Sequence, residues 1–466
     1  MLHILHPPTY LPERHYTHEV LLRSFLCVDC SSGIHGHREV RIELPGDETG
    51  RALILPDNLF QTPETRWLTP ASLPRRPLAQ WDIPDALAQA SVVSRRIPIL
   101  FGLEGEGARF YHEDERGVTL GVDIFGSAFF MLTRYEELAN PLCDSHGRFP
   151  AHASLAWQEG FLERPLVNEY LEILWAALKR LWPRLQRRQR SHRVFLSHDV
   201  DEVFCVAGRG PLAVLRSALA DVARRRDPLL VHDRVRAYVQ VRRGRLDSDL
   251  ANTFDFIMDT SERHGLQSAF YFLADCSPRS TDATYSLDHP WVRTLVRRIG
   301  ERGHEIGLHG SYDSPADPLR IRFEFQTLQR VAVEENIRQA AWGGRHHYLR
   351  WRNPITWRGW AAAGLDYDGT LAYADYAGFR CGVCYEYPVF DLLMRRTLRL
   401  RERPLIVMEV TLLENMHLDW ASACRRIVEL NATCKTFAGD FTLLWHNSTL
   451  ISKNQRHWYN TTLASL

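Results

Sequence analysis

Long apolar runs are missing from this chain of 466 residues. No stretch approaches the roughly 20 consecutive apolar residues that a membrane-spanning helix needs. Residues 1–8 also lack the basic region and the apolar stretch of a signal peptide. Net charge is nearly absent, and at +1 it gives no overall field that would point to nucleic acid or to a membrane. We therefore expect a cytoplasmic protein with no transmembrane segment and no nucleic-acid partner.

Cysteine is scarce, and nine residues in the whole chain are too few for a disulfide framework. The odd number fits reduced thiols. Cys27/Cys30 and Cys381/Cys384 have C-x-x-C spacing, and together they could form a four-thiolate zinc site. Both pairs also lie among apolar residues, where a free cysteine is simply a small buried side chain. The spacing alone does not decide between the two.

The rest of the composition is that of an ordinary globular protein, with 24% charged and 45% hydrophobic residues. We find no internal repeat. An arginine-rich polar stretch at 184–191 follows a predicted helix over 167–181 and precedes an apolar run, which is typical of a linker. We therefore divide the chain into an N-terminal domain, 1–190, and a C-terminal domain, 191–466.

Strand and helix patterns alternate in both predicted domains. In the first domain, 99–102 and 121–125 indicate strands and 127–138 a helix, without a catalytic motif. In the second domain, helices such as 288–302 and 318–339 separate apolar strand patterns at 194–196, 268–273, 304–308, 405–410 and 441–445. This order predicts parallel β/α units, either as an open sheet or as a closed barrel. In both folds, chemistry gathers where strands end.

Acidic and imidazole side chains recur at three of these strand ends: Asp199 and Asp201, then His309 and Asp313, then His446. Residues two apart on a strand point the same way, so the first two carboxylates should leave their strand together. His309 and Asp313 could chelate one ion if their segment coils into a helical turn. Aspartates at strand ends also cap helices and form turns, and a lone histidine is often only hydrogen-bonded.

Taken in order, these segments resemble the motifs of NodB-homology polysaccharide deacetylases, also called carbohydrate esterase family 4. The matching strings are Ser197-His198-Asp199-Val200-Asp201, His309-Gly310-Ser311-Tyr312-Asp313, Arg345-His346-His347-Tyr348 and Leu444-Trp445-His446, with a weaker match at 364–370. The resemblance covers about 194–450. It implies an α/β fold, namely a distorted (β/α) barrel of NodB type. The phrases H-D-V-D and R-x-H-Y-L-R are similar to a capsule and exopolysaccharide subgroup, in which 1–190 would be an N-terminal α/β accessory domain.

The resemblance implies a role for each matching residue. Asp199 would be the general base, His446 the general acid and Arg345 the cation that pairs with Asp199. Asp201, His309 and Asp313 would hold a divalent metal. In the family this metal is usually zinc, and cobalt, manganese or nickel are alternatives. Substrate would be contacted by Tyr312, Tyr348 and Asp368, and the backbone amide of Tyr312 could donate to the developing oxyanion.

This sequence departs from the family pattern at Asp313, where the second motif usually has a histidine. An Asp/His/Asp set carries two negative charges, so a bound cation would be less electrophilic and ions harder than zinc would be favoured. We expect retained metal binding with slower or altered chemistry. The fourth motif, usually built on Asp and Trp, is poorly matched.

The sequence thus predicts a metal-dependent hydrolase that removes acetyl groups from a sugar amide or ester in cell-surface polysaccharide metabolism. The substrate would be an acetylated glycan or a lipid-linked sugar. One alternative is a catalytically weak or inactive glycan-binding or assembly factor on the same barrel. Another is a hydrolase of non-sugar amide C–N bonds. Release of acetate or of ammonia distinguishes these functions.

Three further features have two interpretations each. An insertion after Asp201 carries arginines at 224–226 and 242–245, which could meet an anionic glycan, a lipid-linked pyrophosphate or a membrane surface, or could form the solvated face of a helical hairpin. His346 and His347 could form a second metal site, although neighbours on a strand point apart. Trp351, Trp357 and Trp360 could stack on sugars or pack in the core.

Overall fold

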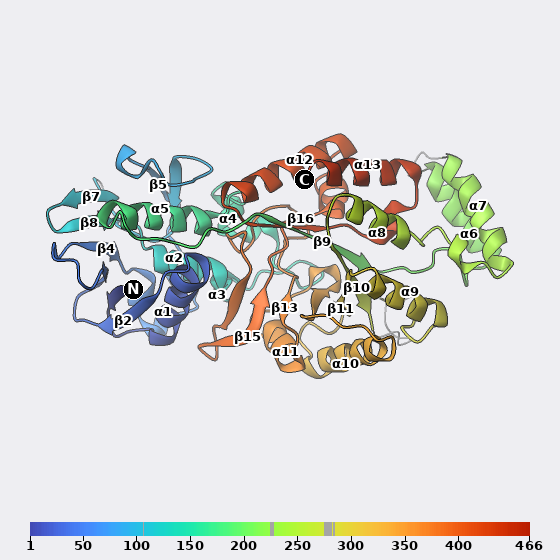
Figure 1. Ribbon diagram of the computed structural model, residues 1–466, viewed down its shortest axis with the longest axis horizontal. Helices are drawn as coiled ribbons and strands as arrows, with labels where there is room; N and C mark the ends of the chain where they lie inside the picture. Colours follow the sequence, from blue (N-terminus) through green and yellow to red (C-terminus); the bar gives the residue numbers. More distant parts are fainter. Residues whose placement is uncertain (106, 224–227, 275–281, 283–284) are drawn as a thin grey trace. The chain divides into compact units, whose positions relative to one another are not determined.

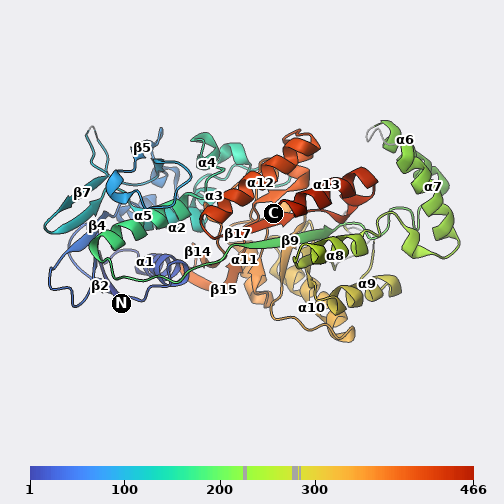
Figure 2. The same ribbon diagram turned by 45° about the horizontal axis from the view of Figure 1, so that its top comes forward.

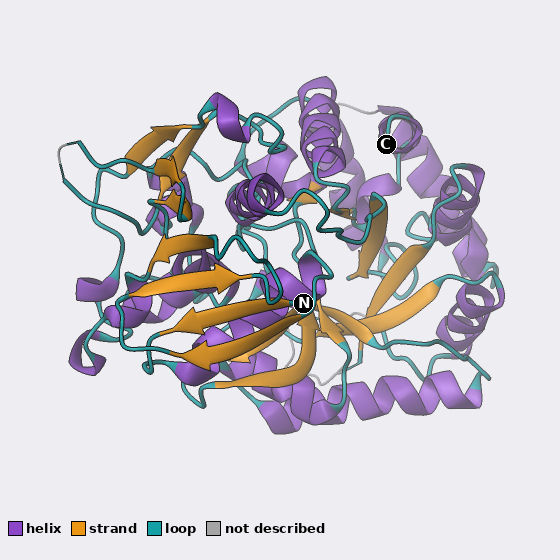
Figure 3. Cartoon of the chain, turned by 60° about the vertical axis from the view of Figure 1, so that its left-hand side comes forward, coloured by secondary structure: helices purple, strands orange, loops and turns teal. Residues whose placement is uncertain are grey.

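The structure is a computed structural model that describes residues 1–105, 107–223, 228–274, 282 and 285–466. It divides into two compact units. The first consists of 1–193, 371–406 and 432–441, and the second of 194–370, 407–431 and 442–466. Helices and strands occur in both units (Figure 3), so the predicted α/β class is confirmed in its coarse form.

The first unit contains a mixed sheet of six strands in the order β2-β1-β3-β4-β8-β7. Its strands are β1 (Leu2–His6), β2 (Cys30–Ile34), β3 (Glu39–Glu43), β4 (Ala52–Pro56), β7 (Tyr111–Asp114) and β8 (Gly117–Leu120). Burial alternates along β1, as expected for a strand with one face on the core. The unit also contains β5 (Ala79–Asp82), β6 (Arg96–Ile99), β14 (Tyr387–Asp391), β15 (Arg396–Glu402), α1 (Leu11–His18), α2 (Ile124–Leu132), α3 (Tyr135–Ala139), α4 (Leu155–Gln158) and α5 (Leu166–Leu181).

The strand expected at 121–125 is wrong, because this segment begins helix α2. Asp123 caps the helix, and its Oδ1 accepts the backbone N–H of Gly126 at 2.8 Å. All nine residues of α2 are buried. A helix that is apolar on every side has no 3.6-residue period in its sequence, so its start cannot be distinguished from a buried strand.

The second unit contains a sheet whose strands follow the order β13-β12-β11-β10-β9-β17-β16. They are β9 (Arg193–Val200), β10 (Ser268–Leu273), β11 (Glu305–Gly310), β12 (Gly343–His346), β13 (Tyr367–Asp368), β16 (Val407–Met408) and β17 (Asp440–Leu444). The pairs from β9 through β10, β11 and β12 to β13 are parallel, as is β16 with β17. The helices are α6 (Pro211–Ala223), α7 (Pro228–Arg242), α8 (Phe254–Arg263), α9 (Pro290–Glu301), α10 (Pro318–Glu334), α11 (Ile355–Ala363), α12 (Trp420–Thr436) and α13 (Lys453–Ala464) (Figure 1).

The predicted β/α alternation is present, and within the described residues no pairing joins β16 to β13. The strands therefore form an open, curved parallel sheet, and the closed form of a barrel is not shown. In the part of the chain that the structure describes, no helix is both long and apolar enough to cross a membrane.

Strand register brings the carboxyl ends of β9, β11 and β12 to one edge of the sheet. Tyr271 of β10 is opposite Asp199, and Leu273 is opposite His309. His309 is in turn opposite Arg345 on β12. Gly344 permits this close pairing, because a Cβ atom there would lie 1.8 Å from the carbonyl oxygen of Leu308. The carboxyl ends of β9, β11 and β12 therefore meet, as parallel strands require.

Candidate metal centre

Asp199 lies at the end of β9 and is fixed by an arginine from β12. Arg345 Nη1 donates to Asp199 Oδ1 at 2.8 Å, and both side chains are almost fully buried. The same guanidinium donates to the Gly369 carbonyl at 2.8 Å and to Ser197 Oγ at 3.1 Å. A planar guanidinium can satisfy three partners at fixed angles, which a lysine ammonium cannot do. The pairing expected from the sequence is thus present.

Asp201, His309 and His347 form the one group of three possible metal ligands found among the described residues. One ligand atom from each lies within 4.8 Å of the other two. Asp201 Oδ1 is 3.2 Å from His309 Nε2 and 3.6 Å from His347 Nε2. His309 comes from the end of β11, and His347 follows β12 directly. Carboxylate and imidazole are suitable ligands for zinc and similar divalent ions.

The far side of each imidazole is held by an acceptor. His309 Nδ1 donates to the Arg345 carbonyl at 2.9 Å, and His347 Nδ1 donates to Asp282 Oδ1 at 2.7 Å. Neither acceptor can donate, so each neutral ring keeps its proton on Nδ1. The Nε2 lone pairs of both rings are then directed at Asp201. This is the outer contact that orients histidine ligands in metal sites.

Two buried atoms of the group are placed so that they could both bind one cation. Asp201 Oδ1 and His309 Nε2 are buried and have no hydrogen-bond partner within the described part of the chain, although they lie 3.2 Å apart. A buried acceptor and a buried lone pair without partners are costly. A divalent ion between them would satisfy both, so the residues present fit a bound metal.

Charge coupling in the group follows the same geometry. Burial favours the neutral acid, but the imidazoles of His309, His446 and His347 lower the pKa of Asp201 well below its ordinary value. Burial opposes charge on His309, yet the carboxylates of Asp199 and Asp201 raise its pKa above the ordinary value. Both shifts have the same cause, which is the close contact between the carboxylates and the imidazoles.

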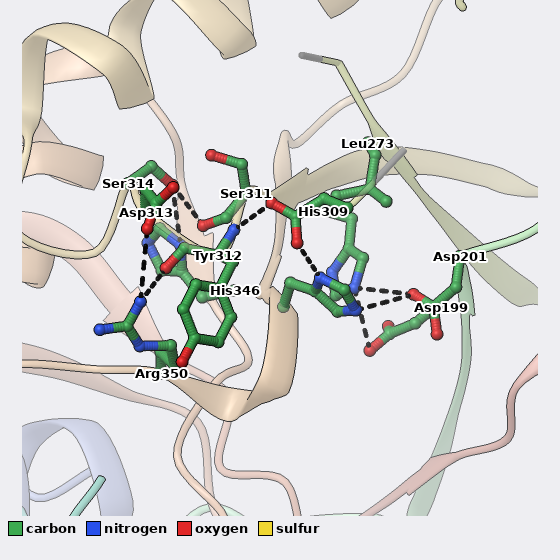
Figure 4. A network of polar contacts seen from close by, with 12 residues as sticks. Asp199, Asp201, Leu273, His309, Ser311, Tyr312, Asp313, Ser314, His346 and Arg350 are labelled. Atoms are coloured by element: carbon green, nitrogen blue, oxygen red, sulfur yellow. Dashed lines mark hydrogen bonds and ion pairs between the residues drawn. The ribbon is translucent and has the colours of Figure 1, made fainter. Parts of the chain in front are cut away.

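Asp313 is not part of this group, so the group differs from the ligand set expected from the sequence. Its side chain is 59% exposed and lies 3.9 Å from Arg320 and 4.0 Å from Arg350. Figure 4 shows it beside Arg350, away from the point where His309 faces Asp199 and Asp201. The physical reason is local: the chain makes turns after β11 and does not coil into a helix, so residues four apart share no face.

His347 supplies the third ligand atom in place of Asp313. The neighbouring imidazoles do point apart, at the point where β12 ends and a short 3-10 helix begins. His346 is buried, its Nε2 accepts Trp360 Nε1–H at 2.6 Å, and burial lowers its pKa to about 3. The two rings therefore do not form a metal site together, but one of them still reaches Asp201. Alternation predicts that the two rings point apart, but it does not predict which of them faces Asp201.

His446 lies close to Asp201 and has a partner that the sequence did not reveal. Its Nε2 is 3.8 Å from Asp201 Oδ2, and its Nδ1 donates to Glu409 Oε1 at 2.9 Å. Glu409 Oε1 also accepts the backbone N–H of His446 at 2.8 Å. Burial disfavours the imidazolium, but Glu409, Asp201 and Asp199 together raise the pKa of His446 to about 10.

The three expected substrate contacts differ in their surroundings. Tyr348 is 48% exposed, and its ring centroid is 4.6 Å from that of His347. The Tyr312 amide already donates to Asp282 Oδ2 at 2.6 Å, so it is not available as an oxyanion donor in this structure. Asp368 is fully buried and accepts the backbone N–H of Thr370, so it cannot meet a substrate here.

The tryptophans and the paired cysteines lie outside the metal centre. Trp351, Trp357 and Trp360 are at most 4% exposed and pack in the core, so they are not an exposed sugar platform. The two C-x-x-C pairs form no group of three ligand atoms among the described residues. Arginines 224–226 lie outside the described residues.

Comparisons with known proteins leave the family of the chain open. Residues 2–183 match a family of unknown function (DUF7033). No curated protein matches the chain. A solved structure of a Mycobacterium smegmatis protein, assumed to be a polysaccharide deacetylase, is 17% identical with a TM-score of 0.38. The match covers 59% of this chain and 84% of that one.

Proposed function

We propose that this protein is a divalent-metal-dependent hydrolase that removes acetyl groups from a sugar amide or ester. The observation that carries the proposal is the ligand group of Asp201, His309 and His347, with Asp199 3.8 Å from His309 and His446 3.8 Å from Asp201. A base, an acid and three ligands at the ends of parallel strands are the parts that amide or ester hydrolysis needs.

The metal would be held by Asp201, His309 and His347. A bound divalent ion supplies Lewis acidity toward a carbonyl oxygen and toward water. This ligand set carries one negative charge where Asp201, His309 and Asp313 would carry two. With one carboxylate fewer, the bound cation would keep more of its electrophilic character than the Asp/His/Asp set would allow. Zinc is then a better match than a harder ion.

Asp199 is the residue placed to take a proton from an attacking water. Arg345, which also donates to Ser197, holds Asp199 Oδ1. The other oxygen, Asp199 Oδ2, faces the metal ligands and lies 3.8 Å from His309 Nε2. One carboxylate oxygen is thus anchored and the other is presented to the site. A base held in this way loses little entropy when it acts.

His446 is the residue placed to return a proton to the leaving group. Glu409 accepts from its Nδ1, so a second proton on the ring would lie on Nε2, which faces Asp201 and the site. The base is next to His309 and the acid next to Asp201, so they contact different members of the ligand group. An acetyl carbonyl between them would have its attacking water on one side and its amine or alkoxide on the other.

An acetylated sugar is the proposed substrate class, from the likeness of the motifs to NodB-homology deacetylases. Tyr348 supports it, because a half-exposed aromatic ring beside a ligand histidine offers an apolar face to a sugar ring. We propose further that the parallel sheet is that of a NodB-type barrel, and that residues 1–190 act as its accessory domain in cell-surface polysaccharide metabolism.

The test is acetate release from N-acetylated and O-acetylated oligosaccharides by the full chain. Protein stripped with a chelator should be inactive, and zinc, cobalt, manganese or nickel should restore activity. Asp201→Asn should abolish the restoration. Asp313→Asn is the matched control, because Asp313 lies outside the ligand group, and it should retain the restoration.

Two competing functions would give different results in the same assay. Glycan binding with no acetate release under any of the four metals would indicate a binding or assembly factor. Release of ammonia or ring opening of a small cyclic amide would indicate a hydrolase of non-sugar C–N bonds. Full activity of Asp201→Asn would contradict the hypothesis of a catalytic metal.

A further inference from the structure

Helices α6 and α7 form a hairpin with a small core of its own. Val214 of α6 and Ala237 of α7 pack with Ala251 in a buried cluster. The two helices are also joined by a buried ion pair, in which Arg234 Nε is 2.6 Å from Asp221 Oδ2 and both side chains are at most 4% exposed. Figures 1 and 2 both show α6 and α7 side by side, apart from the strands of their unit.

The outward face of α6 is apolar. Leu212, Leu215 and Leu219 are 73%, 57% and 62% exposed, whereas Val214 and Ala218 on the same helix are buried. Spacings of three and four residues place the leucines on one stripe, opposite the face that packs on α7. Three adjacent leucines on one helix face are more than the scattered surface apolar residues that need no explanation.

This apolar stripe lies within a basic part of the chain. Between residues 209 and 245 the sequence has ten arginines, three aspartates and no lysine or glutamate, although the whole chain has a net charge of only +1. Arg216 is exposed between Leu212 and Leu219 on the same face. Among the described residues of this segment, the arginines that are exposed on the hairpin and just after it are Arg216, Arg236, Arg242, Arg243 and Arg245, so the hairpin presents positive charge to solvent.

We propose that α6 is an interfacial helix that binds the surface of an anionic lipid bilayer. Its leucines would enter the boundary between headgroups and acyl chains, and Arg216 with its neighbouring arginines would meet lipid phosphates. Charge complementarity selects this occupant over a second copy of the chain, because two copies would bring equally basic hairpins together. The proposal does not rest on the proposed hydrolase activity.

Hydrogen bonds to one aspartate join the two ends of the hairpin. Asp249 accepts backbone N–H groups from Cys205, Val206 and Ala207 at 2.8–2.9 Å, and from Ala251 at 3.0 Å. This single carboxylate ties the chain that enters the hairpin to the chain that leaves it.

The test is co-sedimentation of the full chain with vesicles. Phosphatidylcholine vesicles containing about 30% phosphatidylglycerol should bind the protein about tenfold more tightly than pure phosphatidylcholine vesicles. Raising NaCl from about 0.1 M to about 0.5 M should weaken this binding. The variant Leu212→Ser/Leu215→Ser/Leu219→Ser should bind the anionic vesicles about tenfold more weakly.

A matched control separates the stripe from exposed apolar residues in general. Leu319 and Phe323 on α10 are 76% and 60% exposed, and Leu319→Ser/Phe323→Ser should bind vesicles as the unchanged chain does. Thermal unfolding should be the same for both variants, because the substituted side chains are exposed. Arg216→Glu should weaken binding to anionic vesicles but not to neutral ones.

Three results would overturn the proposal. The first is that the unchanged chain fails to bind anionic vesicles. The second is that the triple leucine variant binds them as tightly as the unchanged chain, which would leave the arginines alone as the contact. The third is that the leucines instead mediate self-association, seen as a dimer of the unchanged chain that the triple variant loses without any vesicle binding.

Discussion

His347 Nε2 lies 3.6 Å from Asp201 Oδ1, although 146 positions separate the two residues. Asp313, which is much nearer to His309 in sequence than His347 is, does not join the group. The contact exists because β9 and β12 end at the same edge of a parallel sheet, and because Asp282 turns the His347 ring toward Asp201. Topology therefore decides which residue completes the ligand group.

Metal affinity should depend on His347 and not on Asp313. His347→Gln should weaken zinc binding to the chelator-stripped protein by about 100-fold, since one of three ligands is lost. Asp313→Asn should stay within about twofold, because the exposed Asp313 carboxylate contributes only distant charge. Isothermal titration with zinc measures both. The reverse order of effects would restore Asp313 to the ligand set.

The outer contact of His347 should matter less than the ligand itself. Asp282→Asn keeps an acceptor oxygen but removes the negative charge that orients the Nδ1–H, so zinc affinity should fall about tenfold. The same titration measures it. A loss equal to that of His347→Gln would mean that Asp282 acts on the metal directly.

Arg345 should be required for turnover and not for metal binding. Arg345→Lys retains the positive charge but cannot donate to Asp199, Ser197 and Gly369 together, so we expect kcat to fall about 100-fold with zinc affinity nearly unchanged. Ser197→Ala is the milder control, because it removes one neutral contact. Equal losses for the two variants would argue against a special role of the guanidinium.

The His446–Glu409 pair should make stability depend on pH in the metal-free protein. The folded-state pKa of about 10 is higher than the ordinary value of 6.5. Its contribution to stability is therefore complete below pH 6.5 and is lost as the pH rises toward 10. Glu409→Gln should lower the melting temperature most near pH 6, and the difference from the unchanged chain should shrink by pH 10. Scanning calorimetry at several pH values measures it. A difference that does not change with pH would contradict the pairing.

The buried Asp221–Arg234 pair should hold the hairpin together locally. Arg234→Ala leaves an aspartate buried without its cation, which should destabilise the hairpin by about 3 kcal/mol. Hydrogen exchange of the α6 and α7 amides should accelerate, while the amides of the sheet should not change. Arg75→Ala removes a pair whose members are 85% and 63% exposed and should have no measurable effect. Faster exchange throughout the chain would show that the hairpin is not a separate unit of stability.

The sequence predicted the parts of the fold that depend on local periodicity. Apolar runs and alternation located β9 and β11, and therefore Asp199, Asp201 and His309. Helix α2 was missed at its start, because an entirely buried helix carries no period.

The partners that complete the site could not be predicted in the same way. Glu409 and Asp282 follow no local pattern, and each lies far in sequence from the histidine that it contacts, 37 and 65 positions respectively. Alternation separates the direction of His347 from that of His346, but it does not say what lies on either side. These contacts depend on strand order and register, which one sequence does not contain.

The hydrogen bonds that Asp249 accepts at the base of the hairpin also bear on how this chain could vary among species. Because one carboxylate joins the chain on both sides of the hairpin, we expect the strand end that carries Asp201 to tolerate changes between residues 207 and 249. Evolution could lengthen, exchange or delete the hairpin as an independent module and leave the neighbouring chemistry in place.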